Sequence, residues 1–229
     1  MKEFFSFENK DFDIPFYRDN PKLTVGMGLL LLFALIVDYL VHGFLYLPIL
    51  SGAISCIILI TPVLYCLNWD YKAIFRKPTM NDMKWAVAMA LLYIIYATII
   101  GTLFDNWGIA GNEVALESSG IIMELAEYIF SLMGEEFIKI ISFILVLTVT
   151  YKLSHNRKAS IVVAAFIALM IFGLEHVVDF RLIYVGLFIQ GLGSVVHLFL
   201  YVKTKNVFVS YISHILTDVL ISLMGLLYI

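Results

Sequence analysis

Long runs of apolar residues, interrupted by short polar stretches, make up most of the chain. A helix needs about 20 mostly apolar residues to cross a hydrocarbon core about 30 Å thick. Runs of this length predict seven membrane-crossing segments, at residues 23–42, 49–67, 85–104, 121–151, 159–178, 182–202 and 206–227. The pattern therefore predicts an all-α fold, a polytopic bundle of transmembrane helices.

The fourth run, 121–151, is longer than a straight crossing needs at a rise of about 1.5 Å per residue. Its first half also carries two carboxylates, Glu124 and Glu127. We therefore predict a break near Met133–Gly134, with an amphipathic or partly inserted helix before it and the true span after it. If residues 112–133 crossed the membrane as well, the number of spans would rise to eight.

Lysine and arginine are concentrated in alternate connections between these spans, a bias that marks the cytoplasmic side. Basic residues are absent from 43–48 and 105–120, and they cluster in residues 1–22, 68–84, 152–158 and 203–205. The remaining connection holds Arg181 alone. The N-terminus is therefore predicted to be cytoplasmic, and seven spans place the C-terminus outside. Eight spans would put two of the basic connections on the wrong side.

The composition also favours a membrane location. Of the 229 residues, 62% are hydrophobic and 14% are charged, and the mean hydropathy is +0.94. Soluble domains average about 45–50% apolar and about 25% charged residues. The net charge of −3, without a basic stripe, argues against a nucleic-acid partner. The lipid bilayer is the expected partner.

The chain is predicted to form one membrane domain without linkers or internal repeats. Residues 1–22 mix charges with aromatics, which differs from the basic region and short apolar run of a cleaved signal peptide. This segment is expected to lie at the cytoplasmic interface, and residues 23–229 form the embedded domain. Cys56 and Cys66 lie in one apolar stretch and are expected to be packing residues.

Ionisable residues inside the apolar runs are the first indication of function. A charge at the bilayer centre costs about 2.5–3.5 kcal/mol, so residues of this kind mark polar sites. In this chain they are Asp38, His42, Glu135, Glu136, Lys139, Glu175, His176, Asp179, His197, His214 and Asp218. Three groups among them stand out by their spacing.

The first group is Glu135-Glu136 with Lys139, at the start of a long apolar run. Neighbouring side chains point about 100° apart on a helix, so the two carboxylates cannot face one point. One of them can act as a general base while the other holds a partner. A charge feature at an interfacial helix end is the plainer alternative.

The second group is Phe172 with His176, and the third is His214 with Asp218. Each pair has i, i+4 spacing, which places its members on one helix face. Phe172 would restrict the rotation of the imidazole and exclude water. Asp218 is expected either to accept the His214 N–H or to line a polar cavity with it. An interfacial histidine and an interhelical hydrogen-bonded pair are the alternatives without catalysis.

One shared intramembrane cavity would provide partners for all three groups at once. Glu135 and His176 are then expected to orient and deprotonate a water molecule. His214 and Asp218 are expected to face the oxyanion that develops when this water attacks a carbonyl. An ionised Asp218 cannot donate a hydrogen bond and would instead support His214.

In these three groups the sequence resembles the CPBP family of intramembrane peptidases, which includes the type 2 CAAX prenyl proteases and the Abi bacteriocin-immunity proteins. The family pattern is EExxxR, then FxxxH, then HxxxN or HxxxD. Within residues 130–220 it corresponds to Glu135-Glu136, to Phe172 with His176, and to His214 with Asp218. The arginine of the pattern would fall at position 140, where this chain has Ile140, one residue after Lys139.

The resemblance implies a multi-pass enzyme of the bacterial cell membrane that hydrolyses a peptide bond of a membrane-associated or lipidated peptide or protein without a cofactor. It implies that Glu135 is the base and that His176 helps to activate water. It also implies that His214 and Asp218 stabilise the oxyanion. Glu136 belongs to the same catalytic set, with Phe172 and Lys139 in support.

Other functions are compatible with the same residues. A non-proteolytic immunity or scaffold protein, or an acyl transferase, would share the fold. A zinc enzyme with Glu135, His176 and His214 as ligands would keep the open water position that metal-assisted hydrolysis needs. A proton-coupled transporter also carries intramembrane Glu, His and Asp, but the chain lacks the repeated halves typical of transporters.

The remaining ionisable residues are expected to have plainer roles. Asp38 and His42 are predicted to form a local i, i+4 pair apart from the site. His197 lies on the sixth span, from which it could approach the cavity. Acidic residues are predicted at the outer mouth of the fifth span and along an outer solvated rim: Glu175 and Asp179 at the mouth, and Glu113, Glu117, Glu124 and Glu127 along the rim.

Overall fold

The computed structural model describes residues 13–16, 22–44, 48–109, 121–177 and 179–227, and every regular element in these ranges is a helix. The main helices are α1 (Val25–Phe44), α2 (Pro48–Cys66), α3 (Met80–Asn106), α4 (Ile121–Ser154), α5 (Arg157–Glu175), α6 (Val195–Thr204) and α7 (Val207–Leu227). The shorter elements are two 3₁₀ turns, η1 (Tyr71–Ala73) and η2 (Phe180–Leu182), and a π-helix, η3 (Val185–Leu192). The all-α prediction is confirmed. Most of the N-terminal segment, with Glu113 and Glu117 of the rim, lies outside the described residues.

Six stretches of the described helices are long and apolar enough to cross a membrane. They lie in α1, α2, α3, α5 and α7, and in the run from η3 through α6. Large apolar side chains are exposed along them, among them Leu29, Ile57, Ile95 and Phe166. Extended apolar surface of this kind suits contact with lipid. The structure therefore agrees with an integral membrane protein.

Helix α4 is one continuous helix of 34 residues, so the predicted break near Met133–Gly134 is wrong. Gly134 serves close packing instead. A Cβ at this position would lie 3.2 Å from Cβ of Ser55 on α2, so a side chain would push the two helices apart. Because the contact comes from a distant segment, the residues around Gly134 give no sign of it.

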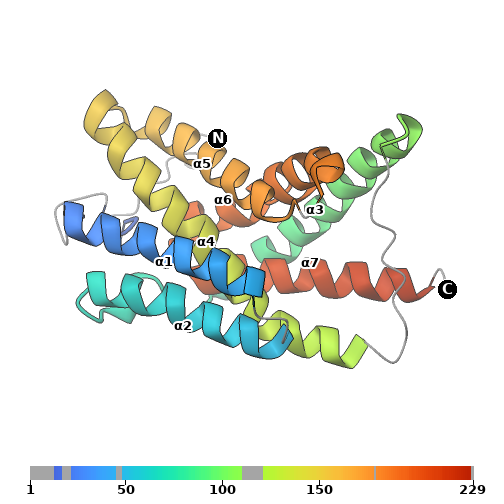
Figure 1. Ribbon diagram of the computed structural model, residues 1–229, viewed down its shortest axis with the longest axis horizontal. Helices are drawn as coiled ribbons and strands as arrows, with labels where there is room; N and C mark the ends of the chain where they lie inside the picture. Colours follow the sequence, from blue (N-terminus) through green and yellow to red (C-terminus); the bar gives the residue numbers. More distant parts are fainter. Residues whose placement is uncertain (1–12, 17–21, 45–47, 110–120, 178, 228–229) are drawn as a thin grey trace.

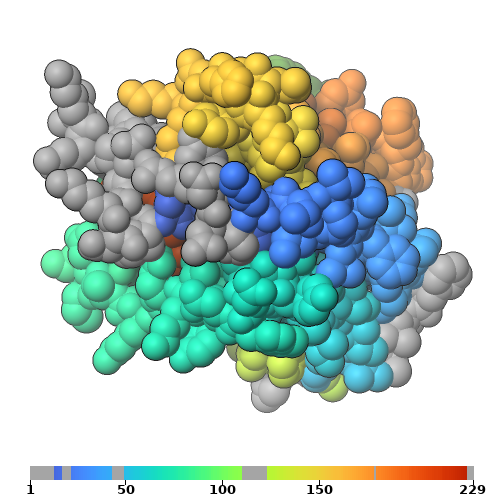
Figure 2. Space-filling view, turned by 90° about the vertical axis from the view of Figure 1, so that its left-hand side faces the viewer, coloured from blue at the N-terminus to red at the C-terminus, as the bar shows by residue number. Residues whose placement is uncertain are grey.

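Helix α4 forms the centre of the bundle and contacts α1, α2, α5 and α7 (Figure 1). Its residues after Glu136 are largely apolar, and Phe137, Ile140, Ile141 and Phe143 are fully buried. A helix that is apolar on all sides is typical of a buried position. Figure 2 shows α1 between α2 and the turn that joins α4 to α5. The middle of α4 is therefore enclosed by other helices.

Helix α5 and the π-helix η3 approach each other closely at glycines. A Cβ on Gly173 would lie 2.6 Å from the carbonyl oxygen of Gly186 and 3.0 Å from Cα of Gly191. The hydroxyl of Tyr96 on α3 donates to the carbonyl oxygen of Phe188 in the π-helix at 2.7 Å. π-Helical segments occur frequently at functional sites. This packing places the end of α5, where His176 follows, directly against η3.

Replacing Gly173 by alanine is expected to destabilise the protein by about 1–3 kcal/mol, because the new methyl group meets backbone atoms that cannot move aside easily. Gly101→Ala on α3 is the matched control, since a Cβ there has no atom within 4 Å. Alanine in an open helix position should be neutral or stabilising by up to about 1 kcal/mol. Thermal unfolding midpoints of the two variants in detergent would check this, and equal midpoints would contradict the close approach.

The connector after α2 holds the turn between α6 and α7. Arg76 donates from Nη2 to the carbonyl oxygens of Thr204 and Lys205, both at 2.6 Å. Asn206 donates from Nδ2 to the carbonyl oxygen of Arg76 at 2.8 Å. Lys205 ends α6 in the left-handed conformation, with φ of 51°. The turn thereby sets the direction of α7 relative to α6, and both helices contribute histidines to the site described next.

Candidate active site

Glu135 and Glu136 lie midway along α4 and have different surroundings. The Glu136 side chain is 1% exposed and contacts residues of α7. The Glu135 side chain is 25% exposed and lies on the wall of a cavity. The two carboxylates therefore belong to two groups of contacts, one closed and one open.

Two imidazoles converge on Glu135 from other helices. Its Oε2 lies 3.7 Å from Nε2 of His176, at the end of α5, and 3.8 Å from Nε2 of His214 on α7. These separations exceed a direct hydrogen bond. Polar groups at this separation are often bridged by water. The fold thus brings together one residue from each of the three sequence groups.

His176 is held by its own helix. Helix α5 ends at Glu175, and His176 is its C-cap. Its Nδ1 donates to the carbonyl oxygen of Phe172 at 2.9 Å, and the Phe172 ring lies 4.6 Å from the imidazole, centre to centre. The i, i+4 spacing thus produces the predicted contact. Because Nδ1 carries the proton of that bond, Nε2 is directed to Glu135 with a lone pair in the neutral ring.

A cavity of about 540 Å³ opens beside Glu135 and His176, between α1, α4 and the end of α5. Asp38 and His42 form the expected local pair, with Oδ2 and Nδ1 3.7 Å apart, and Ser55 Oγ donates to Asp38. Asp38 and His42 nevertheless line the same cavity as Glu135, so the expectation that they lie apart from the site is wrong. The crossing of α1 over α4, which the sequence does not reveal, places them there.

Glu136 is the centre of a buried hydrogen-bond network. Its Oε1 accepts from Lys139 Nζ at 2.5 Å and from His214 Nδ1 at 2.9 Å. The hydroxyl of Ser210 bonds to the second oxygen, Oε2. A carboxylate can only accept, so Nδ1 of His214 carries a proton. This bond orients the His214 ring with Nε2 toward Glu135.

Lys139 reaches Glu136 although it stands one position before Ile140, where the family pattern has its arginine. On a helix, residues at i+3 and i+4 both lie beside residue i. Lys139, at i+3 from Glu136, therefore contacts the carboxylate that a residue at position 140 would also reach. Its ammonium is fully buried and lies 4.5 Å from the centre of the Phe172 ring. Ile140 is fully buried in the apolar core.

Asp218 does not accept a hydrogen bond from His214. Its Oδ2 lies 3.9 Å from Nε2 of His214, beyond hydrogen-bond distance. The N–H at Nδ1 goes to Glu136, which the sequence did not assign as its acceptor. Asp218 lies instead beside the nitrogen that faces Glu135.

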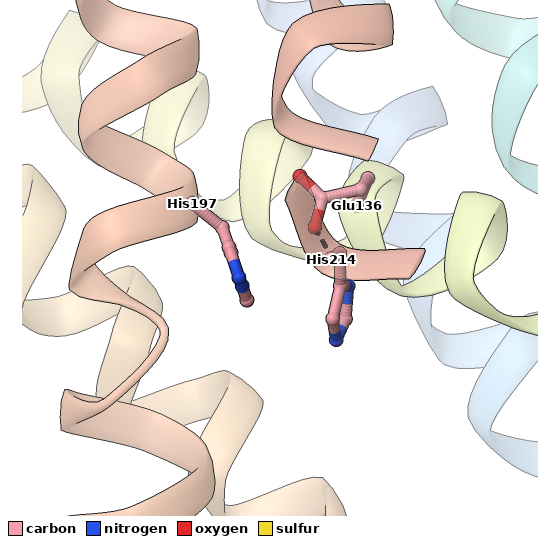
Figure 3. Close-up of side chains that lie close together, drawn as sticks. All are labelled: Glu136, His197 and His214. Carbon is pink, nitrogen blue, oxygen red and sulfur yellow. Dashed lines mark hydrogen bonds and ion pairs between the residues drawn. The ribbon is translucent and has the colours of Figure 1, made fainter. Parts of the chain in front are cut away.

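His197 on α6 belongs to this buried group although it lies outside the three sequence motifs. It is fully buried, and its ring centre lies 4.6 Å from that of His214, with an angle of 30° between the planes. Figure 3 shows the two rings side by side, next to the Glu136 carboxylate. In the sequence, His197 was noticeable only as a polar residue within an apolar run. It has no i, i+4 partner of its own, so its contact with His214 could not be inferred.

The site contains two candidate sets of metal ligands. Glu136, His197 and His214 have ligand atoms within 4.8 Å of one another. The rings of His197 and His214 are tilted by 30° to each other, with their centres 4.6 Å apart. The Lys139 ammonium also lies 2.5 Å from Glu136 Oε1 and 3.4 Å from His214 Nδ1, which opposes a cation there. In the set expected from the sequence, Glu135 Oε2 lies 3.7 Å from Nε2 of His176 and 3.8 Å from Nε2 of His214, but these three ligand atoms are not all within 4.8 Å of one another.

Comparison with known proteins gives no relative, since no family model, no curated protein and no solved structure matches the chain. Function is therefore inferred from the residues themselves. The decisive ones are Glu135 of α4, His176 after α5 and His214 of α7, which are distant in the sequence and adjacent in the fold.

Proposed function

We propose that this protein is an intramembrane endopeptidase of the CPBP type, which hydrolyses a peptide bond of a membrane-associated or lipidated peptide or protein. The observation that carries the proposal is the convergence on Glu135, whose Oε2 lies 3.7 Å from Nε2 of His176 and 3.8 Å from Nε2 of His214. The adjoining cavity of about 540 Å³ gives a substrate segment access to this carboxylate. The order of the three motifs along the chain supports the same family.

In this proposal the site lies within the bilayer of a bacterial cell. Helix α4 is the seventh span beside the six apolar stretches, and it is long enough to cross at a tilt. The alternation of basic connections then places the N-terminus in the cytoplasm. Charged groups that would be costly in lipid face the interior of the bundle, as functional intramembrane residues usually do.

Glu135 and His176 would activate the attacking water. The water donates one hydrogen bond to Glu135 Oε2 and the other to Nε2 of His176, which leaves an oxygen lone pair free for the carbonyl carbon. As the new C–O bond forms, Glu135 takes the proton as a general base. It then passes this proton to the amide nitrogen as the C–N bond breaks. The products are a carboxylic acid and an amine.

His214 would stabilise the oxyanion. Its Nδ1 donates to Glu136, so Nε2 is the nitrogen directed toward the reacting atoms. Nε2 can donate to the oxyanion when the ring carries a second proton, and the Glu136 carboxylate balances that positive charge. Asp218 lies 3.9 Å from the same nitrogen and supports its position. A protonated Asp218 would add a second donor.

Removal of metal ions is expected to leave cleavage unchanged, because Glu135 itself accepts the proton in this mechanism. Purified protein in proteoliposomes would be treated with EDTA or 1,10-phenanthroline and tested on a library of internally quenched hydrophobic peptides. A known zinc protease in the same vesicles is the control for chelation. Loss of cleavage that returns with added zinc would contradict the glutamate mechanism and favour zinc bound by Glu135, His176 and His214.

The same vesicles separate the main alternative, a proton-coupled transporter. A pH-sensitive dye inside the liposomes would report proton movement when the peptide library is added outside. We expect cleavage without proton flux. Flux coupled to peptide addition, in the absence of any cleaved product, would contradict the proposed hydrolase.

A further inference from the structure

His197 is a buried histidine that the proposed mechanism does not use. Its ring lies between two others, 5.3 Å from the Tyr93 ring with planes at 15° and 4.6 Å from the His214 ring with planes at 30°. Tyr93 is held in turn by the π-helix, since its hydroxyl lies 3.3 Å from the carbonyl oxygen of Ile189. The Tyr93 and His197 rings are stacked and the His214 ring packs against His197 at a tilt, so the three rings follow one another from α3 through α6 to α7.

The hydrogen bonds of His197 indicate a neutral ring with the proton on Nε2. Thr217 Oγ1 donates to the carbonyl oxygen of Ser213 at 3.0 Å, so its single proton is used there. Thr217 must therefore accept from His197 Nε2, which lies 3.3 Å away. His197 Nδ1 is buried and has no hydrogen-bond partner in the described part of the chain. A second proton at Nδ1 would be a buried donor without an acceptor, which is costly.

We propose that His197 is a positioning residue, which holds the His214 ring so that its Nε2 faces Glu135. The inference rests on the proposed function, in which His214 stabilises the oxyanion. The bond to Glu136 fixes Nδ1 of His214, but it leaves the ring free to tilt about that contact, because the last torsion of a histidine side chain is broad. The flat face of His197 on one side limits this tilt. The Phe172 ring limits it from another direction, edge to face with its centre 6.5 Å away.

The backbone of His197 contributes to the same arrangement. Ser210 Oγ lies 2.9 Å from the carbonyl oxygen of His197 and also bonds to Glu136 Oε2. Both of these are acceptors, so the Ser210 hydroxyl donates to one of them at a time. Ser210 thereby links α6, which carries His197, to the carboxylate that holds His214. The ring and the backbone of His197 thus act on one imidazole.

The test compares His197→Leu, which keeps bulk but removes the flat ring, with His197→Phe, which keeps a flat ring without nitrogen. Tyr201→Leu is the matched control, because Tyr201 lies one turn later on α6, is equally buried and packs on Phe143 away from the site. We expect His197→Leu to lower kcat about tenfold on the quenched peptide library with KM unchanged, in keeping with the size of aromatic pair interactions. His197→Phe should restore most of kcat, and Tyr201→Leu should retain it.

Nitrogen-15 NMR of the imidazoles provides a readout that does not require cleavage. In the wild type, His214 should give one sharp set of imidazole signals with a proton on Nδ1 bonded to Glu136, and in His197→Leu these signals should broaden because the ring exchanges between orientations. An unchanged His214 signal together with full kcat in His197→Leu would overturn the proposal. A His197→Phe variant as impaired as His197→Leu would also overturn it, because the imidazole and not the stacking would then be required. If the wild type cleaves no peptide, the proposed function fails, and the NMR result still decides whether His197 positions His214.

Discussion

Glu135→Gln is expected to abolish peptide cleavage while the protein still folds and inserts. Glutamine has the same shape as glutamate, but its amide cannot take a proton from water. Loss of a positioned general base typically costs about 10²–10⁴-fold in rate. The hydrogen-bond partners of His176 and His214 on their Nδ1 atoms do not involve Glu135, so their orientation should persist. The measurement is kcat on the quenched peptide library in proteoliposomes.

Glu127→Gln is the matched control for this experiment. Glu127 lies on the same helix about two turns before Glu135 and is half-buried, but it is not among the residues that line the cavity beside His176. Its replacement should change kcat less than about threefold, since it makes no contact with the reacting atoms. A Glu135→Gln variant as active as Glu127→Gln, at equal amounts of inserted protein, would contradict the assignment of Glu135 as the base.

Lys139→Met is expected to destabilise the protein by about 3–5 kcal/mol, because it leaves the buried Glu136 carboxylate without its cation. Both side chains are almost fully buried, at 0% and 1% exposure, so water cannot replace the lost partner. Methionine is close to lysine in shape, so the loss of packing is small. The free energy of unfolding, followed by denaturant titration in mixed micelles, would measure the effect.

The double variant Glu136→Gln with Lys139→Met provides the control within the same pair. Both buried charges are then removed together, so most of the stability should return. Activity should not return, because a glutamine oxygen can still accept from His214 Nδ1 but cannot balance the positive charge that His214 carries when it stabilises the oxyanion. A double variant as unstable as Lys139→Met alone would show that the ion pair is not the cause. A stable Lys139→Met variant would contradict the description of this network.

The sequence was sufficient to predict the apolar helices and the all-α class, because the periods and lengths that lipid requires are local properties. It was not sufficient to describe α4. Acidic residues and Gly134 suggested a break, whereas the helix is continuous and Gly134 packs against Ser55 of α2. Contacts between segments more than 70 residues apart leave no local pattern in a single sequence.

The sequence predicted which residues form the site better than it predicted which of them contact one another. Glu135, His176 and His214 were selected because ionisable residues in apolar runs are costly, and the fold brings these three together. From the i, i+4 spacing, Asp218 was one of two predicted alternatives: an acceptor for the His214 N–H or a second residue lining a polar cavity. In the structure Glu136 of another helix takes that proton. Helix spacing identifies which residues share a face, but it cannot rank a partner on the same helix against one across an interface.

His197 shows a related limit. A lone histidine in an apolar run has no i, i+4 partner that would indicate its contacts. The contacts of His197 come from the crossing of α6 with α7 and from the ring of Tyr93. Lys139 departs from the family pattern by one position, yet it still contacts the Glu136 carboxylate. Because an i+3 residue flanks Glu136 on the helix, Lys139 makes this contact from its own position.

The most direct test of the central claim is the origin of the oxygen in newly formed peptide ends. Membranes containing the wild type or Glu135→Gln would be incubated in water enriched in oxygen-18, and the new C-termini would be identified by mass spectrometry. Hydrolysis by an activated water predicts new C-termini that carry one heavy oxygen in the wild type and are absent in Glu135→Gln. The same set of C-termini in both samples, or none in either at equal protein levels, would contradict the claim that Glu135 activates water for peptide cleavage.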